Sequence, residues 1–258
     1  MDGRFSHFGS EVRMDFEANR DERMRKIAAL LLENRVGTED WGEISKFADK
    51  PCPKKVANKF LICCLLDYQM RWEVVWRNGC RLVTEILGDP EDVWAAITSV
   101  SQEEWRSKFK EYYLHRFPNA HNRLWRIGRE IRNRYDGDAS KVWQGRESAE
   151  VLFRLLDFGA GEQISRMIVG ALHDCRQIKG TGDVKADVHV CRVLGRTLSG
   201  RPTNEAAAIE QARQLNQSDP WQLDWPLWNV GNSLCHPTSP DCPKCYLAPY
   251  CTYAHEHP

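Results

Sequence analysis

One stretch of the chain, from Leu156 to Arg192, constrains the fold more than any other. In it, Gly159 and Gly161 enclose Ala160, and apolar residues spaced for one face of a helix follow the second glycine. The pattern predicts two helices joined by a tight hairpin, because glycine reaches the positive φ values that such a turn requires. Backbone amides at a helix start bind anions, so the hairpin is a candidate phosphate site. An ordinary turn between two helices gives the same pattern.

A second constraint lies near the end of the chain, where four cysteines occur within 17 residues with the spacing C-x6-C-x2-C-x5-C. Thiolates are soft ligands that suit an iron–sulfur cluster or zinc, and the spacing alone does not choose between them. Unligated thiols are the third alternative. Prolines in the segment exclude a continuous helix, so we predict a metal-binding loop. Its cysteines are Cys235, Cys242, Cys245 and Cys251.

The distribution of charge matters more than its sum. The chain carries 36 basic and 36 acidic residues, so its net charge is zero. Between Arg106 and Arg134, however, nine Lys or Arg face only two Glu, a net charge of +7. In a DNA-binding protein some of these arginines would contact phosphates and make binding salt-dependent. The solvated face of an ordinary helix has the same appearance.

Composition limits the class of protein. The 258 residues are 42% hydrophobic, enough for a substantial core in one large or two small domains. No apolar run reaches the length of about 18 residues that a membrane span needs, and the N-terminus lacks the apolar core of a signal peptide. We therefore expect a cytoplasmic protein, whose ten cysteines serve as metal ligands or free thiols before disulfides.

The hairpin, the residues after it and the cysteines together resemble the helix-hairpin-helix (HhH-GPD) DNA glycosylases of the endonuclease III superfamily. In that family a leucine-proline-glycine-valine-glycine hairpin precedes an aspartate in a valine-aspartate-threonine-histidine type motif. Here the hairpin is DFGAG at residues 157–161, and the second motif is ADVHV at residues 186–190. The resemblance implies that Asp187 is the catalytic carboxylate and that the hairpin grips the DNA backbone. It also implies a 4Fe–4S cluster, because the family's cluster loop has the same cysteine spacing.

One departure from the family concerns the position two residues after the second hairpin glycine. Bifunctional members carry a lysine there, which forms a Schiff base with the sugar, whereas this chain has Gln163. A glutamine amide cannot serve as the amine nucleophile of imine formation. We therefore predict a monofunctional glycosylase that leaves the abasic site uncut. The alternative is a bifunctional glycosylase and AP lyase with a displaced lysine, although Lys179 and Lys185 do not align with the family's position.

The resemblance also suggests residues that contact DNA. The family's leucine-leucine-serine-x-glutamine motif has its counterpart in LLDYQ at residues 65–69, so Gln69 inherits the role of a wedge in the DNA stack, or else ends a solvated helix. Tyr68 and Trp72 are candidate base-pocket residues, because aromatic faces stack on a flipped base; they could equally be core aromatics. The other candidate DNA contacts are Arg123, Arg126 and Lys244.

The resemblance covers about residues 20–251 and implies an all-α, two-lobed endonuclease III-like fold, with a helical barrel that carries the hairpin and an iron–sulfur cluster domain. We expect a tail over residues 1–19 and N-terminal helices over 20–55 that pack with the cluster domain. The six-helix-barrel domain is expected over 56–186, and the aspartate helix and cluster over 187–258. Double-stranded DNA would bind in the cleft between the lobes of a monomer, associated with a bacterial or archaeal nucleoid.

The sequence thus predicts a DNA glycosylase that flips out and hydrolyses a damaged, mismatched or naturally modified base. A bulky modified pyrimidine of phage DNA is one such base, and it would make the function antiviral defence rather than repair. Pocket residues that select the base cannot be placed from one sequence. Two other functions stay open: a protein that binds DNA or abasic sites without catalysis, and a zinc-stapled structural protein.

Overall fold

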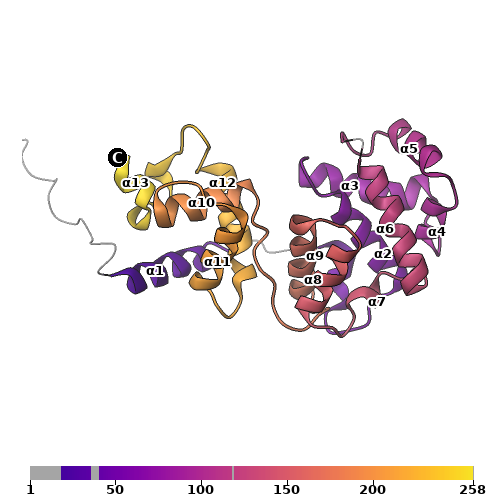
Figure 1. Cartoon of the computed structure of the whole chain (residues 1–258), viewed down its shortest axis with the longest axis horizontal. Helices are drawn as coiled ribbons and strands as arrows, with labels where there is room; N and C mark the ends of the chain where they lie inside the picture. Colours follow the sequence, from indigo (N-terminus) through magenta and orange to yellow (C-terminus); the bar gives the residue numbers. More distant parts are fainter. Residues whose placement is uncertain (1–18, 36–40, 118, 258) are drawn as a thin grey trace, which may run out of the picture.

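The chain folds into two helical lobes (Figure 1). This computed structural model describes residues 19–35, 41–117 and 119–257, and within them the regular structure is helical, with no β-strand. The predicted all-α fold class is therefore confirmed. No helix in the described part of the chain is long and apolar enough to cross a membrane. The expected tail lies outside the described residues except for Asn19.

The first lobe is built around helix α2 (Lys54–Leu66), in which every residue from Phe60 to Leu66 is buried. A helix that is apolar on all sides is stable only when neighbours cover every face, and α3, α4, α6, α7 and α9 pack against it. The helices after α2 are α3 (Trp72–Arg81), α4 (Val93–Thr98), α5 (Gln102–Glu111), α6 (Ala120–Tyr135), α7 (Ser140–Trp143), α8 (Ser148–Asp157) and α9 (Glu162–Asp174); η1 (Gly42–Phe47) and η2 (Leu82–Ile86) complete the lobe.

The second lobe is built around helix α10 (Val188–Ser199), which packs against α11, α12 and α13. A Cβ added to Gly231 of α12 would lie 2.6 Å from the Cβ of His189, so only glycine permits this close approach. Helix α1 (Arg20–Glu33) joins the same core through Ile27 and Leu31. The other helices are α11 (Glu205–Leu215), η3 (Pro220–Leu223), α12 (Asp224–Ser233), η4 (Cys242–Lys244), η5 (Ala248–Tyr250) and α13 (Thr252–Glu256).

The segment 20–55 is divided between the two cores. Helix α1 packs in the second lobe, whereas Ile44 and Cys52 belong to the core of the first. Val184 and Ala186, which precede α10, already belong to the second core. The chain therefore passes between the lobes after α1 and again between α9 and α10.

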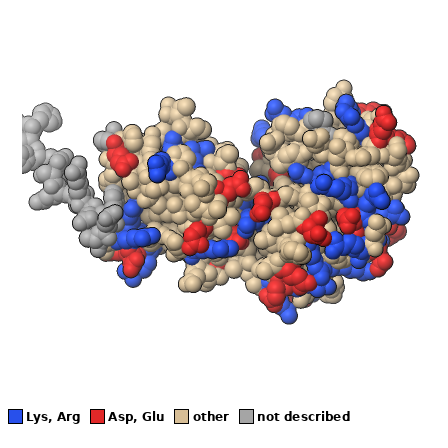
Figure 2. Space-filling view, viewed as in Figure 1, with Lys and Arg blue, Asp and Glu red and all other residues tan. Residues whose placement is uncertain are grey.

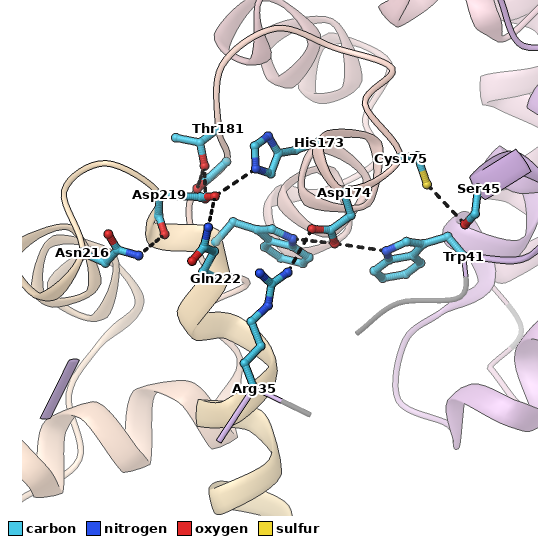
Figure 3. A network of polar contacts seen from close by, with 12 residues as sticks. Arg35, Trp41, Ser45, His173, Asp174, Cys175, Thr181, Asn216, Asp219 and Gln222 are labelled. Atoms are coloured by element: carbon cyan, nitrogen blue, oxygen red, sulfur yellow. Dashed lines mark hydrogen bonds and ion pairs between the residues drawn. The ribbon is translucent and has the colours of Figure 1, made fainter. Parts of the chain in front are cut away.

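A carboxylate at the end of α9 ties the lobes together (Figure 3). Asp174 Oδ2 accepts hydrogen bonds from the indole nitrogens of Trp41 at 3.1 Å and Trp221 at 2.8 Å, and Arg35 lies 3.3 Å from Oδ1. Burial raises the pKa of Asp174, and these donors oppose the rise. Trp221 also packs on Gly170 of α9, where a Cβ would meet the indole at 2.2 Å. The contacts of Trp221 thus join α9 to η3, which packs against helices of the second lobe.

A second polar contact lies beside the first. Nε2 of His173 is 3.0 Å from Oδ2 of Asp219, and Thr181 and Gln222 donate to the same carboxylate (Figure 3). Burial alone would raise the pKa of Asp219, but the three hydrogen bonds lower it. The bond to Asp219 in turn raises the pKa of His173. This contact ties the end of α9 to the segment that precedes α12.

Candidate active site at the junction of the lobes

Asp187 is the N-cap of α10, at the point where the chain enters the second lobe. Its Oδ1 accepts hydrogen bonds from the backbone nitrogens of His189 at 2.8 Å and Val190 at 3.1 Å. A carboxylate at this position satisfies otherwise unpaired amides and lies at the positive end of the helix dipole. The side chain is half-buried. The fold therefore fixes the orientation of the predicted catalytic carboxylate through its own helix.

Gln163, in the first turn of α9, reaches the backbone next to Asp187. Its Nε2 donates to the carbonyl oxygen of Ala186 at 2.9 Å. Its Oε1 is buried and has no hydrogen-bond partner within the described part of the chain. The structure thus brings Gln163 and Asp187 together across the junction, although 24 positions separate them. The amide of Gln163 therefore acts as a hydrogen-bond donor to the backbone.

A second carboxyl group, Asp224 at the start of α12, lies close enough to Asp187 for their charges to interact. Its Oδ1 accepts a hydrogen bond from the backbone nitrogen of Lys185 at 2.5 Å. Burial and the charge of Asp187 raise the pKa of Asp224 to about 8. At neutral pH Asp224 is therefore mainly in its neutral form, as expected of a carboxyl group that is desolvated beside another carboxyl group.

Lys185 connects this pair with the first lobe. Its Nζ is 3.7 Å from Sδ of Met167, one turn further along α9 than Gln163. Its positive charge opposes the rise in pKa that burial causes both at Asp224 and at Asp67, the residue that ends α2. Asp67 is buried and accepts a hydrogen bond from the indole of Trp76 at 2.9 Å. The end of α2 therefore lies near the Asp187 segment.

The hairpin between α8 and α9 adopts the conformation expected of two glycines. Gly159 and Gly161 have φ values of +76° and +88°, which residues other than glycine rarely adopt. The space beside Gly161 is open, whereas Nη2 of Arg126 occupies the space beside Gly159 and donates to its carbonyl oxygen at 2.9 Å. Ala160 is buried. The structure thus joins one arginine of α6 to the hairpin.

The loop after α2 presents the predicted wedge residue. Gln69 is exposed and has a φ of +52°, a left-handed conformation at the tip of a tight turn. Tyr68 is half-buried: its ring stacks on His115 with centroids 4.4 Å apart, and the guanidinium of Arg123 lies 4.4 Å from the ring centre. Trp72 is 50% exposed. Of the two aromatics, Trp72 keeps more surface open to a ligand.

Acidic neighbours neutralise only part of the positive charge of the basic segment, in which Lys108 and Arg134 form ion pairs with carboxylates. Figure 2 shows Lys and Arg side chains over the first lobe, with acidic side chains between them. Within the described residues, none of four arginines of α6 forms an ion pair with a carboxylate; they bind carbonyl oxygens, aromatic rings or a hydroxyl group instead. These arginines are Arg123, Arg126, Arg129 and Arg132.

The four cysteines of the terminal loop line one cavity. Apolar residues complete the lining, among them Val230 and Leu247. Within the described residues, no group of three or more His, Cys, Asp or Glu side chains is arranged around a single ion site. Four thiols that face a shared cavity fit a 4Fe–4S cluster, whose ligands are thiolates at its corners.

Two arginines of α10 hold the beginning of this loop. Arg192 donates to the carbonyl oxygens of Gly231 at 2.6 Å and Cys235 at 2.5 Å. Arg196 donates to Sγ of Cys235 at 3.5 Å and to two carbonyl oxygens further along. Hydrogen bonds to ligand sulfur are among the contacts that tune iron–sulfur clusters. Helix α10 therefore carries the Asp187 cap at its start and supports the cysteine loop along its length.

Lys244, the remaining predicted DNA contact, lies in this loop. Its side chain is 76% exposed, and Nζ forms an ion pair with Asp241 at 2.7 Å. Such an exposed pair contributes little to stability, so the lysine is available to a phosphate at small cost.

Two solved structures share this arrangement of helices. A trapped endonuclease III–DNA covalent intermediate has a TM-score of 0.62 at 16% identity, over 92% of this chain and 97% of that one. A thermostable thymine-DNA glycosylase has a TM-score of 0.63 at 16% identity, over 92% and 99% of the two chains. The chain has the endonuclease III fold. No family model and no curated protein matches the sequence.

Within this fold the predicted residues fall into two groups. Asp187 and Gln163 meet at the junction of the lobes, near Asp67 at the start of the loop that carries Gln69. The cysteine loop with Lys244 lies beyond α10. The sequence did not reveal Asp224, Asp67 and Lys185 as members of the junction. The only indication in the sequence was proximity for two of them: Lys185 is two residues from Asp187, and Asp67 is two residues from Gln69.

Proposed function

We propose that the protein is a monofunctional DNA glycosylase, which hydrolyses the bond between a flipped base and its sugar and leaves an abasic site. The proposal rests on the arrangement of residues at the junction of the lobes. A carboxylate fixed by the N-terminus of α10 lies beside Gln163, whose amide replaces the amine of a lyase and bonds to the backbone instead. The endonuclease III fold supports the same class of activity.

The proposed mechanism begins with double-stranded DNA across the junction. The hairpin and Arg126 bind the phosphate backbone, and Gln69 enters the space that the flipped base leaves. Flipping costs a few kcal/mol, which contacts to the backbone offset. As the glycosidic bond breaks, positive charge develops on the sugar, and the ionised Asp187 stabilises it in a partly buried site. The same carboxylate orients or deprotonates the attacking water.

The cysteine loop belongs to this proposal as a structural part. We infer that Cys235, Cys242, Cys245 and Cys251 hold a 4Fe–4S cluster, because all four line one cavity and an arginine donates to one of the sulfurs. Such a cluster fixes the loop and presents Lys244 to DNA. Glycosidic hydrolysis transfers no electrons, so the residues of the junction suffice for the reaction. Purified holoprotein should be brown and absorb at about 400 nm.

The test uses duplexes that carry uracil, thymine glycol, G·T, 8-oxoguanine·A, alkylated bases or the modified pyrimidines of phage DNA. Each reaction is divided, and one half is heated in alkali before the strands are separated. Breaks that appear only after alkali, and not with Asp187→Asn, support a monofunctional glycosylase and identify its substrate class. Salt-sensitive binding without breaks on any substrate would leave the protein as a non-catalytic DNA binder.

One observation favours a bifunctional alternative. Lys185 Nζ lies against Met167 on α9, one turn from the position that a lyase lysine occupies. An amine there would attack the sugar, form an imine and cut the strand. Borohydride traps such an imine as a covalent protein–DNA adduct. An adduct with the wild type that disappears in Lys185→Met would favour the alternative; absence of an adduct, with abasic product present, favours the monofunctional mechanism.

A further inference from the structure

Two cysteines outside the junction lie next to each other in the first lobe. Cys63 of α2 is buried and Cys80 of α3 is exposed, and their sulfur atoms are 3.9 Å apart. The helices approach closely at this point because Gly79 has no side chain: a Cβ there would lie 2.7 Å from Sγ of Cys63. Neither cysteine belongs to the terminal loop, so neither is committed to the proposed cluster.

The surroundings shift the pKa values of the two thiols in opposite directions. The hydrogen bond with Cys63, helped by the charge of Lys59, lowers the pKa of Cys80 to about 6. The same bond, together with burial, raises the pKa of Cys63 well above its usual value. The lowered pKa raises the fraction of Cys80 that is thiolate, which is the nucleophilic form, and Cys63 remains a protonated neighbour. An exposed thiolate next to a second thiol is the arrangement found in redox-sensitive cysteine pairs.

We propose that Cys80 and Cys63 are an oxidisable dithiol that hydrogen peroxide converts to a disulfide. In the first step the Cys80 thiolate attacks one peroxide oxygen. The O–O bond breaks, sulfur loses two electrons, and the products are a sulfenic acid and hydroxide. In the second step Cys63 attacks the Cys80 sulfur. The S–S bond forms, the S–O bond breaks, and the hydroxyl group leaves with the Cys63 proton as water.

The bond requires only a small movement. The sulfur atoms must approach from 3.9 Å to about 2.05 Å, and the exposed Cys80 side chain is free to rotate toward its buried partner. The disulfide would link α2 to α3, the helices on either side of the loop that carries Gln69. It would thus restrict how far that loop can open. The inference rests on the two thiols and not on the proposed glycosylase activity.

The test treats full-length holoprotein with hydrogen peroxide, alkylates the remaining thiols and maps the peptides by mass spectrometry. We expect a crosslink between the Cys63 and Cys80 peptides and at least a ~10-fold loss of Cys80 alkylation, both reversed by dithiothreitol. In Cys63→Ser, Cys80 should proceed to sulfinic acid. Cys52→Ser, which removes a buried thiol elsewhere in the same lobe, should still form the crosslink.

Three outcomes would overturn the proposal: Cys80 reacts no faster than the other thiols, it crosslinks to a different cysteine, or it reaches sulfinic acid while Cys63 is present. Peroxide also attacks iron–sulfur clusters, and the same peptide map reports oxidation of the four loop cysteines separately. Lys59→Gln gives a graded check, because loss of the nearby charge should slow alkylation of Cys80 by roughly threefold while the crosslink still forms.

Discussion

Two aspartates at the junction of the lobes, Asp174 and Asp187, have similar surroundings but different partners. Both oxygens of Asp174 are occupied by side chains from two lobes, Trp41 on one side and Trp221 and Arg35 on the other. Within the described residues, the hydrogen bonds to the Asp187 carboxylate all go to Oδ1 and come from backbone nitrogens of its own helix. The first carboxylate holds the lobes together, and the second is oriented but keeps an oxygen for a ligand.

The comparison shows that burial alone does not distinguish a structural carboxylate from one that is free to bind a ligand. The difference is whether the surrounding donors occupy both oxygen atoms of the carboxylate. Asp224 is an intermediate case, since one backbone nitrogen bonds to it while burial and the Asp187 charge favour its neutral form. The contrast between these three groups predicts which substitutions affect chemistry and which affect stability.

The largest effect is expected for Asp187→Asn. The amide still caps α10, so the free energy of unfolding should change by less than about 0.5 kcal/mol, while loss of the negative charge should slow base release by about 10³-fold. Single-turnover base release and urea unfolding measure the two quantities. An equal loss of both stability and activity would place Asp187 with Asp174 among the structural carboxylates.

Asp174→Ala should show the opposite behaviour. It leaves two indole N–H groups and a guanidinium without their shared acceptor, and we expect a loss of about 3 kcal/mol in the free energy of unfolding. Base release per folded molecule should stay within about threefold of the wild type. The matched control is Glu150→Ala, which breaks exposed ion pairs with Arg146 and Arg154 and should cost under about 1 kcal/mol. Equal losses in the two variants would refute the interlobe role of Asp174.

Asp224→Asn should change how stability depends on pH. In the folded protein the pKa of Asp224 is about 8, whereas in the unfolded chain it is about 3.9. The folded state therefore holds the proton more tightly, and the stability that Asp224 contributes is complete below pH ~4 and lost as the pH rises to ~8. Asparagine stays neutral, so the variant should gain up to about 5 kcal/mol over the wild type at high pH. Urea unfolding at acidic, neutral and alkaline pH measures this, and parallel curves would contradict it.

The smallest effect is expected for Arg126→Gln. Loss of one phosphate contact beside the hairpin should weaken DNA binding several-fold and reduce the slope of log K against log salt by about 1. Arg129→Gln is the control, because its guanidinium lies over Trp125, 5.1 Å from the ring centre, rather than at the hairpin. Salt titrations of binding to one duplex distinguish them. An equal change of slope in both variants would show that the arginines of α6 attract DNA through their combined positive charge and not through individual contacts.

The sequence predicted those features that depend on local chemistry. Two glycines one residue apart specify a hairpin, because glycine reaches the backbone angles that such a turn requires. Four cysteines separated by prolines specify a loop of thiols. The all-α class and the two-lobed fold followed from the resemblance to the endonuclease III superfamily.

Only the tertiary structure determined which of these features meet. The packing of α9, α10 and α12 determines three contacts at the junction. Gln163 donates a hydrogen bond to the backbone before Asp187, the charge of Asp187 helps to raise the pKa of Asp224, and the charge of Lys185 opposes the rise in pKa of Asp224 and Asp67. The division of residues 20–55 between the cores was likewise decided by long-range burial. Sequence patterns report the preferences of neighbouring residues, whereas pKa values and shared contacts arise from groups that are far apart in the chain and desolvated together.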